Sequence, residues 1–176
     1  MHLNLPWLTE VARAKKPARL PTVLTRDEVQ RLFKYIEDPL LDLVVRLLYG
    51  TGMRVMECVR LRVQDVGFAR RELVVRDGKG GKDRVTMLPA CLAEGLQAHL
   101  RVVKAERDAD LAIGCGEVWM PDALAVKYPN AVRRWGRQYV FPAAGFAVDP
   151  RSGTVRRHHL DKRRVQRAMW RAAQRA

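Results

Sequence analysis

Apolar residues recur at helical spacing over most of this chain, interrupted by one short interval of strand-like pattern. A capping box formed by Thr25 and Glu28 predicts the start of a first helix with one buried face. An Asp-Pro pair then predicts the start of a second helix, Leu40–Tyr49, which is apolar on almost every side. We expect this second helix to be the buried centre of the domain and to be closed by Gly50.

A short third helix and a small antiparallel sheet are expected next. The helix covers Arg54–Leu61, and two strand-like runs follow, Glu72–Arg76 and Arg84–Leu88, joined by a glycine-rich turn. Val66 and Phe68 supply a candidate third strand. These elements predict a mainly helical α+β fold in which the antiparallel sheet is a minor part.

The second half of the chain is less regular. Leucines at helical spacing predict a further helix, and this periodicity fades at about Ala105. From about 105 to 160, proline, glycine and aromatic residues accumulate, which we interpret as an insertion packed by its aromatic side chains. The run Leu160–Ala176 is helical again, and beside its apolar side lies a side with four arginines: Arg164, Arg167, Arg171 and Arg175. Residues 1–21 are interpreted as a linker or the end of a preceding domain, so that the domain itself covers 22–176.

The chain carries a large excess of positive charge, with 33 Lys and Arg against 19 Asp and Glu and a net charge of +14. Such an excess indicates a polyanionic partner, nucleic acid before an anionic membrane. Nine of the basic residues but only one acid lie in the last 26 residues, for which a solvated basic tail is the alternative. No apolar run is long enough to span a bilayer and no leader opens the chain. Three cysteines without paired spacing favour the cytoplasm over a disulfide framework or a zinc site.

The segment Gly50-Thr-Gly-Met-Arg54-Val-Met-Glu57 places an arginine at the start of a helix, directly after a Thr-Gly turn. Helix-start amides and guanidinium groups both bind anions, and one guanidinium group can hold two phosphate oxygens. Glu57, three residues further on, lies on the same side of the helix and is expected to orient Arg54. The alternative is an ordinary surface arginine beside a glutamate that stabilises the helix.

The second motif is the turn between the two predicted strands, Gly-Lys79-Gly-Gly-Lys82-Asp-Arg84. A lysine among glycines at a hairpin tip can move into a groove and reach a phosphate; a merely solvated turn is the alternative. A nucleotide-binding P-loop is excluded, because Lys82 is followed by Asp83 instead of serine or threonine and the turn precedes a strand.

Together, the two motifs and their surroundings resemble the catalytic domain of the tyrosine recombinases. The resemblance extends from about residue 20 to the end of the chain and is carried by Leu48-Tyr-Gly-Thr-Gly-Met-Arg-Val-Met-Glu and Val75-Arg-Asp-Gly-Lys-Gly-Gly-Lys-Asp-Arg. Within that family the chain is most similar to the integron integrases. Their insertion is matched by short segments that begin at Pro121, Lys127, Tyr139, Asp149 and Arg156.

The resemblance implies transesterification at a DNA phosphodiester. In this chemistry a tyrosine attacks the phosphate, forms a 3′-phosphotyrosyl link and releases a 5′-hydroxyl, and no metal or nucleotide cofactor is needed. Arg54 matches the family's first catalytic arginine, and Lys79 matches the hairpin lysine that acts as general acid. Lys82 and Arg84 match phosphate-positioning residues. The implied partner is DNA, on which the family assembles as a tetramer, in the bacterial cytoplasm at the nucleoid.

The resemblance also implies that the second half of the active site is absent from this chain. The family's His-x-x-Arg box and nucleophilic tyrosine lie near the C-terminus, and neither is found here. The tyrosines of this chain lie elsewhere, at Tyr35, Tyr49, Tyr128 and Tyr139. We therefore expect a truncated catalytic domain that binds DNA and is inactive on its own.

The Arg-Arg-His-His segment has a different implied role. His158 and His159 do not form the missing box, because Asp161 and Lys162 stand three residues after them. In integron integrases this region, with a preceding proline matched by Pro150, is associated with bases flipped out of a folded single-stranded recombination site. Stacking of an unpaired base on imidazole or proline is physically reasonable; histidines that cap or pack a basic helix are the alternative. The candidate DNA-binding residues are therefore Glu57, Lys82, Arg84, Pro150, Arg156, Arg157, His158, His159, Arg164, Arg167 and Arg171.

Two other classes of function remain open. One is a basic DNA- or RNA-binding module in which Arg54 and Lys79 do no chemistry, and the other is a remnant without a role. Salt-sensitive binding to folded hairpin DNA in preference to plain duplex separates the recombinase from both alternatives.

Overall fold

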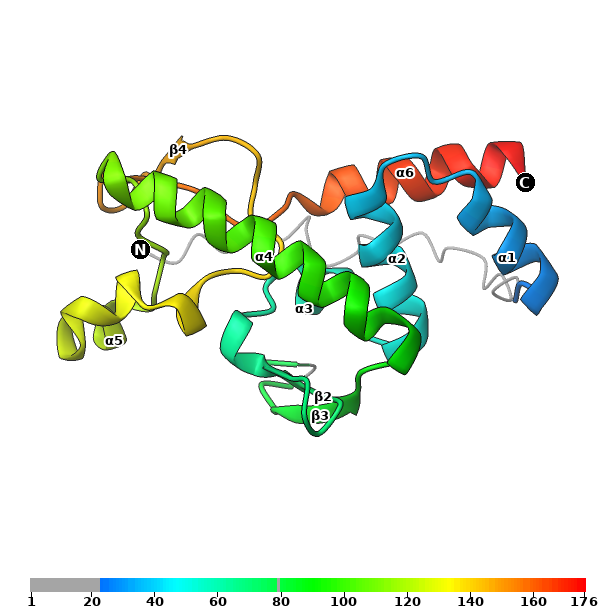
Figure 1. The fold of residues 1–176 in the computed structure, drawn as a ribbon, viewed down its shortest axis with the longest axis horizontal. Coiled ribbons are helices and arrows are strands. Elements are labelled where there is room, and N and C mark those ends of the chain that lie inside the picture. The colour runs from blue at the N-terminus through cyan, green and yellow to red at the C-terminus, as the bar shows by residue number, and fades with distance from the viewer. Residues whose placement is uncertain (1–22, 79) are drawn as a thin grey trace, which may run out of the picture.

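The computed structural model describes residues 23–78 and 80–176 and consists mainly of helices, with a small antiparallel sheet (Figure 1). In chain order, the elements are α1 (Arg26–Lys34), α2 (Pro39–Thr51), α3 (Val55–Val59), η2 (Val63–Asp65), β1 (Val66–Gly67), β2 (Glu72–Val75), β3 (Arg84–Met87), α4 (Ala90–Ala112), α5 (Asp122–Lys127), η3 (Pro129–Arg133), η4 (Trp135–Arg137), β4 (Ala147–Val148), β5 (Val155–Arg156) and α6 (Lys162–Arg175). The linker expected at 1–21 lies outside the described residues.

The long helix α4 runs obliquely across the domain in Figure 1. At one end of the view lie α1, α2 and α6, and at the other lie α5 and the β4–β5 hairpin of the insertion (Figure 1). Helix α6 packs against α1, α2 and α3, so the C-terminal helix closes the core that the first three helices begin. Val165 and Ala172 are its buried residues, which confirms the predicted apolar side. Within the described residues, no helix is long and apolar enough to cross a membrane.

The first two helices begin where their caps predict. Thr25 and Glu28 form the expected capping box, and Asp38 accepts hydrogen bonds from the backbone of Leu40 and Leu41. The predicted C-terminus of the second helix is wrong, however, because the helix continues through Gly50 and is closed by Gly52. Gly52 has φ 65°, the left-handed conformation that favours glycine at this position.

Gly50, which lies inside the helix, is instead required for close packing of the helix against Pro89. A Cβ atom at this position would lie 2.7 Å from Cγ of Pro89, the residue that precedes α4. The glycine therefore lets the end of α2 approach the start of α4. The third helix is also shorter than expected, with Arg54 as its N-cap and Arg60 as its C-cap.

The three predicted strands form an antiparallel sheet in the order β1-β2-β3. Leu73 and Val75 are the buried residues of β2, and β3 is an edge strand. The Thr86 hydroxyl of β3 donates a 3.2 Å hydrogen bond to the Thr51 carbonyl at the end of α2. This bond fixes the sheet beside the turn that leads into Arg54.

Helix α4 extends beyond the expected loss of periodicity at Ala105 and ends at Ala112. Its early turns bury leucines, whereas the last turns bury a carboxylate, Asp110, which pairs with Arg157 of the insertion. In these last turns an ion pair takes the place of buried apolar side chains. Hydrophobic spacing alone therefore could not predict the last turns of α4.

The insertion is joined to the core by extended segments that hydrogen-bond to one another. Val63 and Gln138 are linked by a backbone bond of 3.0 Å, and Val140 donates to the Leu61 carbonyl at 2.8 Å. Further along, Leu160 donates to the Phe141 carbonyl at 2.8 Å. Segments from the end of α3, the insertion and the start of α6 therefore lie side by side.

Two glycine-to-alanine substitutions should shift stability in opposite directions. Gly52→Ala should destabilise the domain by about 1 kcal/mol, because alanine is strained at φ 65° although nothing lies within 4 Å of the added Cβ. Gly95→Ala, in the exposed face of α4, should stabilise it by about 0.5–1 kcal/mol, since its Cβ would make only an ordinary 3.9 Å contact with Leu43. Urea unfolding measures both, and equal signs would contradict either the left-handed cap at Gly52 or the helical position of Gly95.

Candidate active site and DNA-contacting surface

The Glu57 carboxylate joins the start of α3 to the first residue of β3. It accepts hydrogen bonds from the backbone nitrogen of Arg54 at 2.8 Å and from Nη1 of Arg54 at 3.1 Å. It also accepts two bonds from the guanidinium group of Arg84, at 3.0 and 2.8 Å. The contact expected between Glu57 and Arg54 is therefore present, and Glu57 binds Arg84 as well.

Burial and charge make this carboxylate a strong acceptor. The Glu57 side chain is only 7% exposed, whereas that of Arg54 is 57% exposed. Hydrogen bonds from Arg84, followed by those from the backbone and side chain of Arg54, lower the pKa of Glu57 to about 2 against the effect of desolvation. Glu57 is therefore ionised at neutral pH and holds Arg54, whose side chain is more than half exposed.

Gly78 allows the hairpin to approach this ion cluster. A Cβ atom at Gly78 would lie 2.9 Å from the Lys82 carbonyl oxygen, 3.0 Å from Nη1 of Arg84 and 3.4 Å from Oε1 of Glu57. Only glycine therefore fits without displacement. Lys79, the predicted general acid, lies outside the described residues, so its convergence with Arg54 on one surface stays a prediction. Lys82 is exposed on the same hairpin.

A second ion pair supports the base of the hairpin. Arg76, directly after β2, contacts Asp65 at 2.7 Å, and Asp65 is only 3% exposed. Asp83 accepts a 2.9 Å bond from the backbone of Asp77 and lies 3.6 Å from Nη1 of Arg76. A carboxylate therefore holds each end of the turn: Asp65 binds Arg76 after β2, and Glu57 binds Arg84 at the start of β3.

The two histidines belong to a cluster of aromatic rings. Tyr139 stacks with His158 at a centroid distance of 5.6 Å and meets His159 edge-on at 5.5 Å. On the same tyrosine ring lies the guanidinium group of Arg62, 3.8 Å from the centroid. Tyr139 is only 3% exposed, whereas His158 is exposed and His159 half-buried. Pro150 is exposed, in the turn between β4 and β5.

Burial and nearby arginines lower the pKa of both histidines below the usual value, which favours neutral rings at pH 7. The pKa of His158 is lowered by burial and then by His159, Arg62 and Arg60. The pKa of His159 is lowered mainly by burial, opposed by its hydrogen bond with the Leu160 carbonyl. Among the described residues, no group of three His, Cys, Asp or Glu side chains could hold a metal ion.

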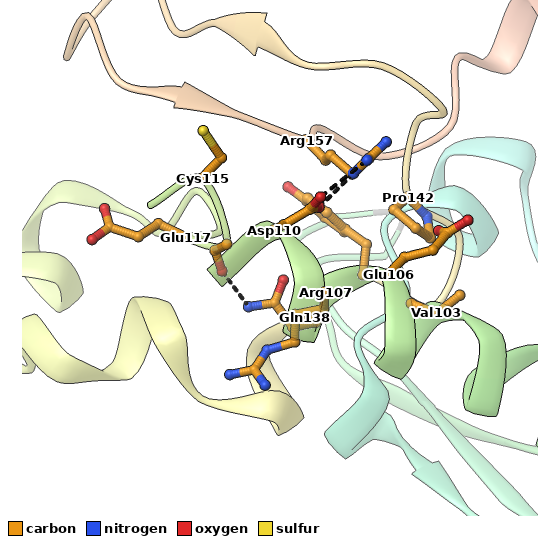
Figure 2. A pocket seen from close by; sticks show the side chains of 11 residues that line it. Val103, Glu106, Arg107, Asp110, Cys115, Glu117, Gln138, Pro142 and Arg157 are labelled. Atoms are coloured by element: carbon orange, nitrogen blue, oxygen red, sulfur yellow. Dashed lines mark hydrogen bonds and ion pairs between the residues drawn. The ribbon is translucent and has the colours of Figure 1, made fainter. Parts of the chain in front are cut away.

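The structure gives Arg156 and Arg157 partners within the protein. Arg156 is only 9% exposed and contacts Asp149 at 2.7 Å. Arg157 hydrogen-bonds to Asp110 across the small pocket between α4 and the insertion, as Figure 2 shows. Its guanidinium group also lies 4.4 Å from the centre of the Phe146 ring. Both arginines therefore fasten the insertion, and their predicted DNA contacts stay untested.

The arginine side of α6 faces the connection between α1 and α2. Arg164 contacts Asp38 at 3.1 Å, and Arg175 contacts Glu37 at 2.6 Å. All four side chains are substantially exposed, so each pair contributes at most about 1 kcal/mol. Such weak surface pairs leave these arginines able to exchange a carboxylate for a phosphate.

Between the two pairs lies a cleft of about 510 Å³. Arg167 and Arg171 line it and are exposed, and Ile36, Leu41 and Ala168 supply apolar parts of its wall. The predicted arginine side of α6 therefore forms one wall of a cleft instead of an open convex surface.

Comparisons with known proteins identify the family. The model of the phage integrase family matches residues 22–176. Over 173 residues the chain is 46% identical to an integrase/recombinase of Escherichia coli, covering 98% of this chain and 51% of that protein. An integrase/recombinase of Pseudomonas aeruginosa matches to the same extent. The tyrosine recombinase XerA of Thermococcus onnurineus is 46% identical over 88 residues, covering 49% of this chain and 31% of XerA.

Two solved structures share the fold. A crystal structure of XerA recombinase matches with a TM-score of 0.51 and 24% identity, covering 92% of this chain and 46% of that one. The integrase from mycobacterium phage Brujita matches with a TM-score of 0.50 and 20% identity, covering 94% and 42%. The chain belongs to the phage integrase family, the tyrosine recombinases, which confirms the predicted fold class. It spans about half the length of the curated relatives it matches.

Sequence reasoning missed Arg62 and Tyr139 as neighbours of the histidine pair. They are far apart in the chain and meet only because Arg62 and Tyr139 occupy opposite positions in a backbone bridge. The sequence shows both residues, but no rule of local spacing predicts a contact between residues so far apart in the chain.

Glu57→Gln should destabilise the domain by roughly 1–3 kcal/mol at pH 7, because charge-assisted bonds to two arginines are lost. The folded-state pKa of about 2 lies below the unfolded value, so this contribution is complete above about pH 5. It should be lost progressively as pH falls toward 2. Urea unfolding of wild type and variant at several pH values measures the difference.

Glu94→Gln is the matched control, because Glu94 is an exposed glutamate of α4. It should change stability by less than about 0.5 kcal/mol. Equal stability of wild type and Glu57→Gln at pH 7 would mean that the carboxylate does not hold the two elements together.

Proposed function

We propose that this chain is part of a site-specific DNA recombinase that acts by tyrosine transesterification. The observation that carries the proposal is the Arg54–Glu57–Arg84 cluster, in which an exposed guanidinium group at a helix start is fixed next to a basic hairpin. Such a group stabilises charge on phosphate oxygens, provided that it is oriented before the substrate arrives. Lys79 is assigned the role of general acid toward the leaving oxygen.

Membership of the family supports DNA as the partner, and the charge of the chain supports it independently. The net charge of +14 favours a polyanion, and the exposed Lys82 and Arg54 lie on neighbouring elements. We assign Arg84 and Glu57 to positioning, since they bind each other as well as Arg54. Assembly as a tetramer on DNA at the nucleoid belongs to the same proposal.

Within the family we assign the chain to the integron integrases. The support is the insertion at about 105–160, which carries Pro150 in an exposed turn and His158 on the surface. In this proposal the substrate is a cassette recombination site, folded from a single strand, with unpaired bases that stack on the histidine pair. A neutral, exposed imidazole is suited to base stacking.

We further propose that the 176-residue chain binds DNA but does not cleave it. Tyr139 is buried, and burial raises its pKa, which disfavours the nucleophilic phenolate. Tyr49 packs edge-on against Phe33, with ring centroids 5.6 Å apart. The sequence contains no His-x-x-Arg box, so the second phosphate-clamping arginine that this box would supply is missing.

The second candidate function is a basic nucleic-acid-binding module without chemistry. The observation that favours it is that Arg156 and Arg157 bind Asp149 and Asp110 within the protein. These two arginines therefore have a structural role that does not require recombinase chemistry. Selective binding of folded hairpin DNA over duplex favours the recombinase assignment, and equal binding favours the module.

Binding to hairpin DNA should weaken steeply with salt. If roughly six to ten phosphates are contacted, affinity should fall about a thousandfold or more between 50 and 200 mM salt. Arg164→Gln, Arg167→Gln and Arg171→Gln combined should lower the slope of log affinity against log salt by about one unit per lost contact. Fluorescence anisotropy titrations measure both effects.

Arg101→Gln combined with Lys104→Gln removes exposed charge from α4 and controls for net charge alone. An unchanged slope in the triple variant would place the arginine side of α6 away from DNA. Flat affinity across the salt range would contradict nucleic acid as the partner.

No covalent protein–DNA adduct should form with a suicide substrate nicked near the crossover. Arg54 and Lys79 can polarise a phosphate but cannot supply the attacking oxygen, and loss of the nucleophile removes the covalent route. A denaturing gel detects the adduct. A shifted band that disappears in Tyr128→Phe or Tyr139→Phe would show that the insertion supplies a nucleophile.

A further inference from the structure

Three side chains from distant parts of the chain form successive layers. The guanidinium group of Arg62 lies 3.8 Å from the centre of the Tyr139 ring. The Tyr139 ring in turn stacks with His158 at 17° between ring planes and 5.6 Å between centroids. Arg62 follows α3, Tyr139 belongs to the insertion, and His158 precedes α6.

The inner layers of this stack are fixed. Arg62 donates to the carbonyl oxygens of Arg137 at 2.7 Å and Trp119 at 3.0 Å, which holds its guanidinium plane in the insertion. Tyr139 is only 3% exposed. A guanidinium group over an aromatic face is attractive, and more so where both are shielded from water.

The outer face of His158 is left uncovered by its neighbour. The centroid of His159 lies 4.2 Å from that of His158, at 82° between ring planes. It lies 5.5 Å from Tyr139, no farther than His158 does, so His159 stands beside the stack rather than on its outer side. His158 is exposed, and neither of these two rings is placed to cover it on the side away from Tyr139.

The orientation of His158 depends on a neutral ring. Its Nδ1 atom accepts a 2.8 Å hydrogen bond from the backbone nitrogen of His159, which protonation of Nδ1 would abolish. The charged and titratable groups that face His158 are Arg60, Arg62, His159 and Asp149. Three of them disfavour a positive charge on the ring, and only Asp149 favours it.

We infer that Tyr139 and Arg62 are positioning residues for base capture, holding the His158 ring so that an unpaired nucleobase stacks on it as the next layer. The inference rests on the proposed function and adds two residues that do not touch DNA themselves. Base stacking on a ring is favourable for every base, so the arrangement selects unpaired bases without reading their sequence.

The test uses the full chain and a DNA hairpin with 2-aminopurine as a single bulged base, compared with the same hairpin without the bulge. Wild type should quench the fluorescence and prefer the bulged hairpin by about 5- to 150-fold, the range expected for one stacked base. Tyr139→Phe keeps the ring and should retain this preference within about twofold. Tyr139→Leu removes the ring and should lose most of the preference and the quenching.

Tyr128→Leu is the matched control, because Tyr128 is an exposed tyrosine of the same insertion. It should leave the preference unchanged. Should Tyr139→Leu not fold, Arg62→Lys carries the test, since lysine keeps the charge but loses the planar contact and the paired carbonyl bonds. That variant should lose several-fold of the preference.

A pH series separates positioning from general loss of structure. In wild type, quenching should persist below about pH 6.5, the usual pKa of histidine, because His158 resists protonation. In Arg62→Gln the loss of quenching should move to higher pH. If wild type neither quenches nor prefers the bulge, base capture itself is wrong. If wild type does both and the Tyr139→Leu and Arg62 variants match it, only the positioning inference is overturned.

Discussion

The candidate active site depends on one buried carboxylate placed between two arginines. Glu57 accepts bonds from Arg54 on its own helix and from Arg84 on the neighbouring strand, and it is almost inaccessible to solvent. A buried carboxylate with a single partner would be costly, but two guanidinium groups and a backbone amide saturate its oxygens. The helix start and the hairpin are thereby held in one arrangement.

The same principle fastens the insertion. Asp110 at the end of α4 binds Arg157, and Asp149 binds Arg156, so acidic residues in an otherwise basic chain are used as internal anchors. The excess of positive charge then remains on residues that are exposed, such as Lys82, or held in weak surface pairs, such as Arg164. The sequence gives only the net charge, whereas the structure shows that some basic residues bind acidic residues within the protein and others face the solvent.

Local signals in the sequence predicted much of the fold. The capping box at Thr25 and the strand-like run that begins at Glu72 depend on neighbouring residues, and both were confirmed. The end of α2 was missed because two glycines lie close together, and only tertiary packing against Pro89 decides which one closes the helix. The contact of Glu57 with Arg54 follows from helical spacing, whereas its bonds to Arg84 span 27 residues and follow only from the sheet. For the same reason no local pattern connected Arg62 with Tyr139.

The lack of space for a side chain at Gly78 has a consequence for exchanging segments between related proteins. The space that a Cβ atom would need there is already occupied by the Lys82 carbonyl, Arg84 and Glu57. Glu57, Gly78, Lys82 and Arg84 therefore form one interlocked cluster, and a chimera with a junction between them would combine surfaces shaped for different neighbours. Junctions after Pro89 or before Asp38 leave this cluster and the contact between Gly50 and Pro89 whole, so exchange of segments should succeed there more often than at a junction inside the cluster.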